Sequence, residues 1–461
     1  MKNLLFILLF TCTLHAQQKT WSIDTIIEYA VKNSQTIKNS ELSLENRVQN
    51  SAIARSAYDL GISSTASSKT DGSSDSQSFR LNQPLPAGFE ANVTGAHSQN
   101  GNSDTDNTDL ALSISKQILG GGSLSSSLKS IRNAHTDELI GLNSLKRSKR
   151  DLVRDVMNSF YRLIRISKSL DISLRRLETS KKNLEMAIAR EDPLDISSAK
   201  INVPRDEISV IAARVNLKNE LDNLQVLMGL APKEEFKVET NFEFSLAKPN
   251  SAEDMIYAQQ NSEDFLNLEL SRIKLDRELE DRDEKNSVDV SLFVRHNLEN
   301  DTNENINLRG DEETTVGVNL NWTLGNRAEI AQLKIAKNNL RENGFDYKIL
   351  YNQRLQSLRR LERALNELNK SIQVQIQEIK FNEEQLELYK DRWESGKMAI
   401  LEYLRSQNRL EDSRIQLINL KTNYMETLQN YLFDTGMSYA PNLTIVKKDK
   451  LTNLDEISVY K

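Results

Sequence analysis

Few side chains in this 461-residue sequence are placed to do acid–base or metal chemistry. His97, His135 and His296 each stand alone, without the second histidine and the glutamate of a zinc-binding HExxH helix. The sequence also lacks a glycine-rich phosphate loop and a nucleophile elbow. We therefore predict that the protein is not an enzyme and binds no metal or cofactor.

Two groups of charged residues could still bind ions. The run at 280–284 holds four acidic residues, but its position before a strand pattern predicts the solvated end of a helix rather than a cation site. Glu402 and Arg405 are three residues apart, so on a helix they would form a surface ion pair worth about 0.2–0.5 kcal/mol. Neither group predicts catalysis.

The composition argues against a large compact core and against nucleic acid as a partner. Hydrophobic residues make up 38% of the chain and charged residues 27%, and the mean hydropathy is −0.55. The 66 Asp and Glu residues outnumber the 60 Lys and Arg residues, which leaves a net charge of −6. Such a chain has no general attraction for phosphate backbones.

The N-terminus predicts export from the cytoplasm. Residues 1–16 combine a basic start, a short apolar run and a small residue, Ala16, as a secretory signal peptide does. Cys12 could be a lipid-attachment site, but Phe10 and Thr11 before it do not fit one. The mature chain then has no cysteine, so packing without disulfides must hold it together. No later run of about 18 apolar residues predicts a spanning helix.

The strongest pattern is helical. Apolar residues recur at steps of three, four or seven through 121–190 and again through 327–393, which predicts two rods of about 100 Å. Second helical segments follow at 194–228 and 399–433 after short breaks at 191–193 and 394–397. Each pair is therefore expected to form an antiparallel helical hairpin.

The chain is a tandem duplication. Matching residues recur at an offset of 205–207 within the hairpins and at 228 upstream of them. We expect a first repeat at 17–231, with strands at about 86–118 and a helical hairpin at about 120–229. A linker or equatorial segment follows at 232–250, and the second repeat spans 251–436, with strands at about 287–324 and a hairpin at about 326–434; residues 437–461 form a tail. The first repeat carries about 22 extra residues, most simply the Ser-rich stretch 61–83, whose role the pattern leaves open.

Two strands of about ten residues are expected in each repeat, because apolar and polar residues alternate there. That length crosses a bilayer at a tilt. The residues expected to face lipid in the second repeat are Val290, Leu292, Val294, Val316, Val318, Leu320 and Trp322. Four strands cannot close a membrane barrel, so several chains must contribute. Two copies would supply 8 strands and three would supply 12, and only the latter leaves room for a conduit.

The layout resembles the TolC family of outer-membrane efflux proteins over essentially the whole mature chain. Residues 392–404, RWESGKMAILEYL, are similar to the helical turn of the family's second repeat. Residues 321–327, NWTLGNR, are similar to its strand-to-helix exit, and residues 81–88, LNQPLPAG, resemble a segment of some members. The motifs are individually unspecific, whereas their order, spacing and duplication together are specific.

The resemblance implies a mainly α fold with a membrane β-barrel. Three copies would form a 12-stranded barrel in the outer membrane, continued by an α-helical tunnel through the periplasm, and a periplasmic adaptor and an inner-membrane transporter would feed it. The helical turns expected to contact the adaptor comprise Glu191, Asp192, Pro193, Ser395, Gly396 and Lys397.

The same resemblance places Glu402, Arg405 and Asp195 at the periplasmic aperture. Arg405 occupies a position that is acidic in the family, so Glu-Arg pairs could latch the aperture in place of an acidic ring.

Two alternatives remain open at this point. A periplasmic or surface coiled-coil spacer would use the rods for reach and conduct nothing, although it would not need four strands with lipid-facing residues. A secretion duct for a protein substrate would have the same sequence features as a small-molecule efflux duct, because the inner-membrane partner selects the cargo.

Overall fold

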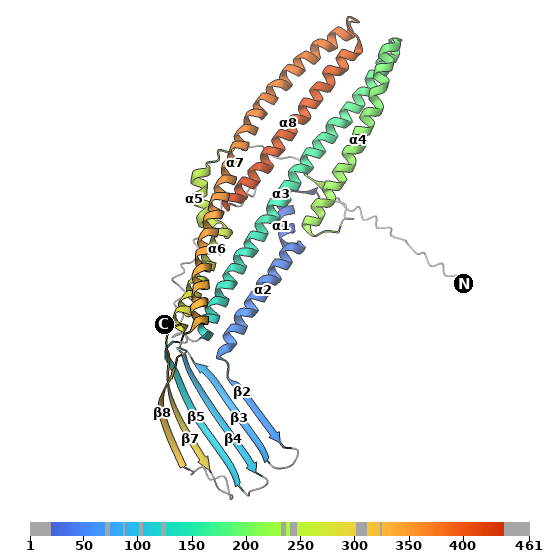
Figure 1. Ribbon diagram of the computed structural model, residues 1–461. Coiled ribbons are helices and arrows are strands. Elements are labelled where there is room, and N and C mark those ends of the chain that lie inside the picture. Colours follow the sequence, from blue (N-terminus) through green and yellow to red (C-terminus); the bar gives the residue numbers. More distant parts are fainter. Residues whose placement is uncertain are drawn as a thin grey trace, which may run out of the picture. The chain divides into compact units, whose positions relative to one another are not determined.

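The computed structural model describes residues 20–69, 74–85, 88–100, 105–120, 126–231, 237–239, 247–300, 311–322 and 325–437. The expected signal peptide at 1–16, and all of the expected tail except Met437, lie outside these residues. The described chain consists mostly of helices together with one antiparallel sheet and a short two-stranded sheet, which confirms the mainly α part of the expected fold and the presence of an antiparallel sheet (Figure 1). None of the described helices is both long and apolar enough to cross a membrane.

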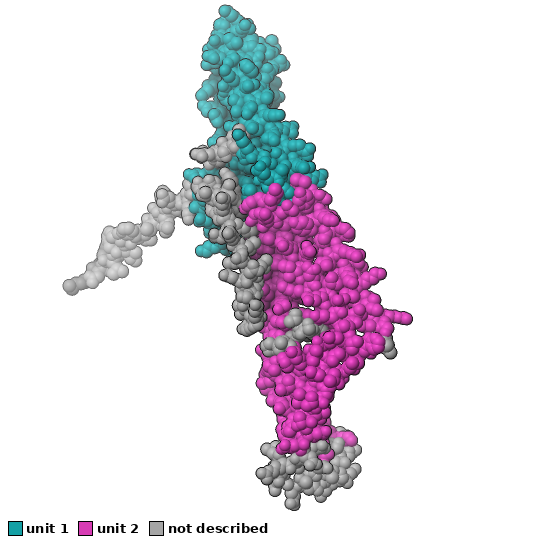
Figure 2. All heavy atoms as spheres, turned by 90° about the vertical axis from the view of Figure 1, so that its left-hand side faces the viewer, with its two compact units in different colours: residues 1–38, 148–255, 356–461 teal, residues 39–147, 256–355 magenta. Residues whose placement is uncertain are grey.

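The chain divides into two compact units (Figure 2). Unit 1 comprises residues 1–38, 148–255 and 356–461, and unit 2 comprises residues 39–147 and 256–355. The longest helices are α3 (Ser126–Ala189) and α7 (Arg327–Glu394), and each contributes residues to both units. Each of the two sequence repeats contributes residues to both units, so the boundary between the units is not the boundary between the repeats.

Unit 1 contains the paired helices expected from the sequence. Helix α4 (Pro193–Met228) follows α3 after a short turn, and α8 (Ile400–Thr435) follows α7. Both returning helices end in the same way, at Gly229 and Gly436, where the N–H of the residue after the glycine bonds to a carbonyl five residues back. Strand β1 (Thr20–Trp21) pairs in parallel with β6 (Lys237–Val238), and α1 (Ile23–Asn33) contacts α4.

The hairpins of unit 1 carry polar pairs at equivalent positions. Arg176 Nε lies 2.9 Å from a carboxylate oxygen of the buried Asp206 in the first hairpin. In the second, the side-chain amide of Asn382 donates to Ser413 Oγ at 2.9 Å. Residues 176 and 382, like 206 and 413, match at the offsets of the duplication. The register of the two hairpins has therefore been preserved although the paired groups differ.

Unit 2 holds the sheet. Its strands lie in the order β2 (Gly61–Ser68), β3 (Ser74–Leu85), β4 (Phe89–Asn100), β5 (Thr105–Leu119), β7 (Asp289–Asn300) and β8 (Asp311–Asn321), and every neighbouring pair is antiparallel. The pairing of β5 with β7 joins the strands of the two repeats into one sheet.

The number of strands corrects the sequence prediction. We expected four strands per chain, and the sheet has six, because the Ser-rich stretch forms β2 and most of β3. The sequence of β2, GISSTASS, contains one large apolar residue, so alternation of hydrophobicity could not reveal it. The later strands begin and end within a few residues of the predicted positions, although β8 ends at Asn321 and leaves Trp322 just beyond it.

Ion pairs connect the helices of unit 2, which include most of α2 (Gln35–Arg55), most of α5 (Ser251–Asn261) and all of α6 (Glu263–Lys285). Asp264 of α6 binds both Arg147 and Arg354, the latter at 2.6 Å. The acidic run at 280–284 lies at the end of α6, as predicted, and Asp281 there pairs with Lys129 and Lys285. Hydrogen bonds from these two lysines lower the pKa of Asp281 despite the opposing effect of its burial. No cluster of potential metal ligands occurs in the described part of the chain.

Candidate functional site

The first candidate site is one face of the six-stranded sheet. The strand register places Val290 opposite Leu320, Leu292 opposite Val318, and Val294 opposite Val316, so these six residues share a face. Ile114 lies opposite Val294, which continues the same face onto β5. Val316, Val318 and Leu320 are 75%, 63% and 64% exposed. No described element covers this apolar face of unit 2. Single apolar residues scattered on a surface are common, but a continuous exposed apolar face indicates contact with a partner or a membrane.

The opposite face of the sheet is polar. Ser291 lies opposite Asn319, and Arg295 opposite Thr315. An aromatic exception is Phe293, whose ring covers Gly317 on the neighbouring strand so closely that a Cβ there would be 2.5 Å from it. The glycine thus makes room for an aromatic side chain on the polar face. The sheet therefore separates an exposed apolar surface from a hydrophilic one.

The second candidate site comprises the two turns of unit 1. Asp192 precedes α4 and its side chain accepts a hydrogen bond from the N–H of Leu194 at 2.9 Å, and Pro193 occupies the first helical position. This is a favourable start for a helix, because the cap satisfies a free N–H and the proline needs none. In the other turn, Gly396 and Lys397 bond through their N–H groups to the carbonyls of Trp393 and Arg392.

The two turns differ at their left-handed residue. Gly396 has a φ of 72°, and the equivalent position in the first turn is Glu191 with a φ of 60°. Glu191 is the sole described residue other than glycine with a positive φ. A Cβ in this conformation clashes with the backbone, so the first turn carries a strain that the second avoids. Glutamate in place of glycine thus changes the residue and leaves the left-handed backbone conformation in place.

The Asp195 side chain is bound within the chain itself. The resemblance implied an aperture position equivalent to Glu402, but the Asp195 side chain is buried and only 7% exposed in this chain. Its Oδ1 accepts a hydrogen bond from the N–H of Ile400 at 3.2 Å. Ile400 begins α8, whose preceding residue, Ala399, has no side chain able to cap it. Asp195 therefore caps α8 from the neighbouring hairpin.

Glu402 and Arg405 form the surface pair that their spacing predicts. Arg405 Nη1 lies 2.9 Å from Glu402 Oε1, and the side chains are 63% and 49% exposed, respectively. An exposed pair at this spacing contributes little to folding. Within this chain the pair is satisfied locally, and both side chains remain accessible to solvent.

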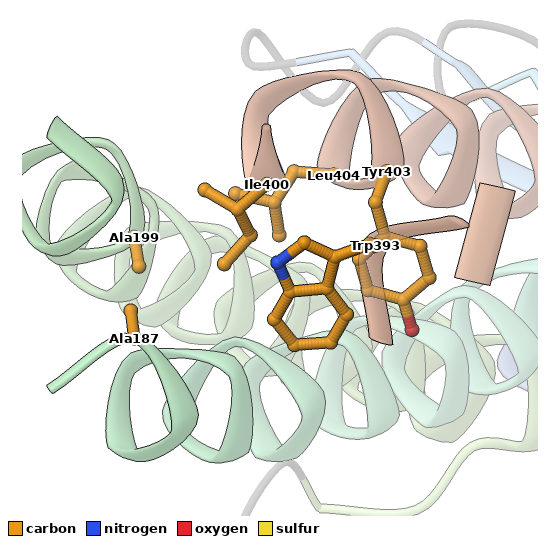
Figure 3. Close-up of a cluster of buried hydrophobic side chains, with 6 residues drawn as sticks. All are labelled: Ala187, Ala199, Trp393, Ile400, Tyr403 and Leu404. Atoms are coloured by element: carbon orange, nitrogen blue, oxygen red, sulfur yellow. The ribbon is translucent and has the colours of Figure 1, made fainter. Parts of the chain in front are cut away.

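The turns rest on a hydrophobic cluster that the sequence analysis did not identify. It consists of Ala187, Ala199, Trp393, Ile400, Tyr403 and Leu404. Figure 3 shows these six side chains together. The Trp393 indole stacks on the Tyr403 ring with a distance of 5.0 Å between ring centres, and the Arg190 guanidinium lies 4.3 Å from the centre of the indole. Burial raises the pKa of Tyr403, and the nearby Glu394 carboxylate adds to the effect. Trp393 lay within the recognised motif, but its stacking partner ten residues later could not be read from spacing alone.

Solved structures of bacterial outer-membrane channels have the same fold. The chain resembles the Campylobacter jejuni CmeC outer membrane channel with a TM-score of 0.66 and 12% identity, over 90% of this chain and 85% of that one. It resembles VceC of Vibrio cholerae with a TM-score of 0.67 and 14% identity, over 90% and 96%. The Neisseria gonorrhoeae MtrE outer membrane channel in its open state gives a TM-score of 0.68 and 12% identity, over 90% and 88%.

The sequence supports the same class. A model of the outer membrane efflux protein family matches residues 276–431, which extend from the end of α6 through β7, β8 and α7 into α8. A search of curated protein sequences finds no match. The match covers about a third of the chain. The resemblance inferred from its motifs is confirmed.

Proposed function

We propose that this protein is an outer-membrane duct. It would conduct substrates passively to the exterior from a periplasmic adaptor and an inner-membrane transporter. The observation that carries this proposal is the exposed apolar face of the sheet, backed by a polar face on the same strands. A wall of this kind can face hydrocarbon on one side and a water-filled lumen on the other. A coiled-coil spacer would have no use for it.

The free edges of the sheet support assembly from several copies. β2 and β8 are the outermost strands, so each presents one row of backbone groups without a partner strand among the described residues. Each unsatisfied backbone group costs several kcal/mol in lipid, and a sheet avoids this cost there only by closing into a barrel. A homotrimer in the outer membrane provides that closure.

The helical turns are the proposed contact site for the adaptor. Residues 191–193 and 395–397 lie at the ends of the two hairpins, and the described side chains of these residues are mostly exposed. The aperture role belongs, in this proposal, to Glu402 and Arg405. Asp195 is assigned to the support of the turns instead, because its carboxylate is already engaged by α8.

The proposal is tested first on the detergent-extracted full-length protein. We expect a trimer by light scattering and discrete conductance steps in a planar lipid bilayer. A water-soluble monomer or dimer without channel events would overturn the duct and favour the spacer.

A pair of variants tests the membrane face itself. Val318→Arg places a charge on the apolar face and is expected to destabilise membrane insertion by about 2–4 kcal/mol if the site is near the bilayer centre. Asn319→Arg, the next residue on the polar face, is the matched control and should insert normally. Equal insertion of both variants would contradict the assignment of the faces.

A further inference from the structure

The hairpin formed by β2 and β3 is present in the first repeat and absent from the second. We infer that this hairpin is part of the barrel wall, that β2 pairs with β8 of a neighbouring copy, and that three copies close a barrel of 18 strands. The inference rests on the proposed function for its trimer. It differs from that proposal in the number of strands and in the strand that forms the contact between subunits.

The hairpin is a continuous extension of the sheet. Every residue from Gly61 to Ser68 has a partner in β3, and every residue of β3 from Gln77 to Leu85 has a partner in β4. At the base of the hairpin, the Gln83 side chain donates to the carbonyl of Tyr58 at 2.7 Å. The pairing of β3 with β4 is as long as that of β4 with β5. A loosely attached surface hairpin would not have this register.

The two faces of the sheet also continue through the hairpin. Ile62 lies opposite Leu81, Leu81 opposite Val93, and Val93 opposite Leu112, which makes one apolar row across four strands. On the other face, Ser63 lies opposite Arg80 and Arg80 opposite Thr94. Ile62 is 71% exposed. The hairpin therefore has the same apolar and polar sides as the strands expected to cross the membrane.

The directions of the two edge strands allow closure. β2 leads away from the helices that precede it, whereas β8 leads back towards α7 (Figure 1). Because all neighbouring strands are antiparallel and their number is even, β2 of one copy meets β8 of the next in the antiparallel sense. The junction thus continues the pattern of the sheet without a parallel pair.

The added strands would widen the conduit. At a given tilt, the radius of a closed sheet follows from the strand number and a spacing of about 4.8 Å, so 18 strands give about 1.5 times the radius of 12. The cross-section grows about 2.2-fold, and barrels of 16–18 strands enclose an aqueous channel. The polar face, with Ser63, Arg80, Thr94, Ser113, Arg295 and Asn319, would line this channel. A channel of this width with a polar lining fits bulky, hydrated cargo.

The first test crosslinks the predicted junction in the full-length trimer. Cysteine replaces Ser63, Thr65 or Ser67 in β2, combined with Thr315→Cys or Asn319→Cys in β8; all of these positions lie on the polar face. A disulfide needs Cα atoms about 4.4–6.8 Å apart, so opposite residues alone should react, and the six combinations sample neighbouring registers. We expect at least one combination to give covalent dimers and trimers on oxidation. The single variants control for unspecific oxidation.

The matched control replaces Asn92 or Thr94 in β4 with cysteine, together with the same β8 positions. β4 is paired on both sides, to β3 and to β5, so no crosslink is expected. Crosslinking of β4 to β8 would mean that the hairpin lies outside the barrel and that 12 strands close it, which overturns the inference. A trimer in which no β2–β8 combination reacts would overturn it as well.

Electron cryomicroscopy of the trimer supplies the direct strand count. Eighteen strands support the inference, and 12 strands contradict it while leaving the proposed duct intact. A protein that is monomeric by light scattering would instead refute the trimer, and with it the proposed function.

Discussion

Asp195 stabilises the start of a helix that lies 205 residues further along the chain. A helix begins with N–H groups that its own backbone cannot satisfy, and α8 has alanine where a capping side chain is usual. The carboxylate of Asp195 supplies the missing acceptor and a favourable charge for the helix dipole. One buried residue thus couples the ends of the two helical hairpins in unit 1.

Replacement of Asp195 should therefore loosen the turn before α8. We expect Asp195→Ala to lower the stability of this region by about 1–2 kcal/mol, the usual effect of removing a cap. The measurement is the rate of limited proteolysis in the turn at 395–399, together with the midpoint of thermal unfolding. Asp195→Asn keeps an acceptor oxygen and should behave nearly as the wild type. Equal sensitivity of the two variants would argue against capping.

Glu426 of α8 predicts a pH dependence. Burial raises the pKa of this carboxyl above its ordinary value of 4.5, and the charge of Glu220 adds to the rise, although Arg165 and Arg162 oppose it. Because the pKa of Glu426 is raised in the folded state, the contribution of its protonation to the free energy of unfolding is fully present below pH 4.5. This contribution is lost as the pH rises through the pKa of the folded state. Glu426→Gln should consequently raise the unfolding midpoint at pH 7, and the gain should shrink as the pH falls towards 4. A gain that is the same at both pH values would contradict this cause.

At the scale of elements, the long helices and four of the sheet's strands were predictable because each repeats a simple period. β2 was not, since small polar residues such as Ser63 and Thr65 carry no hydrophobic alternation and its pairing with β3 depends on the neighbouring strand. The hydrogen bond between Asp195 and the start of α8 could not be predicted for a different reason. Its partner is distant in the sequence, and a buried carboxylate that caps another helix has the same local sequence as an exposed one.

The turn between α3 and α4 offers a prediction at this scale. Glu191→Gly should stabilise the protein by about 1 kcal/mol, because glycine adopts the positive φ at this position without a steric penalty. Gly396→Ala, the reverse change at the equivalent place, should destabilise it by a similar amount, although no neighbouring atom lies within 4 Å of the new Cβ. Thermal unfolding of the two variants measures both effects. A change in the unfolding midpoint of the same sign in both variants would show that the two turns are not equivalent.

At the scale of the whole molecule, the proposed aperture can be tested by ion selectivity. Three copies of the Glu402–Arg405 pair would present no net charge, so Glu402→Gln should leave three unpaired positive charges at the aperture and shift selectivity towards anions. The reversal potential across a salt gradient in a planar bilayer measures this. Glu178→Gln breaks another exposed pair, with Lys182 at 2.7 Å, and serves as the control. An identical reversal potential in the two variants would place Glu402 outside the aperture.

The pairing of β5 with β7 joins the two repeats inside one chain just as β8 would join β2 across two chains. The repeats are unequal, however, because four strands of the sheet come from the first and two from the second. A barrel built from three such chains would alternate sectors of four strands with sectors of two, so its symmetry would be three-fold. A cargo or adaptor that contacts the ring would then meet two chemically distinct kinds of surface in alternation, and one chain would supply both.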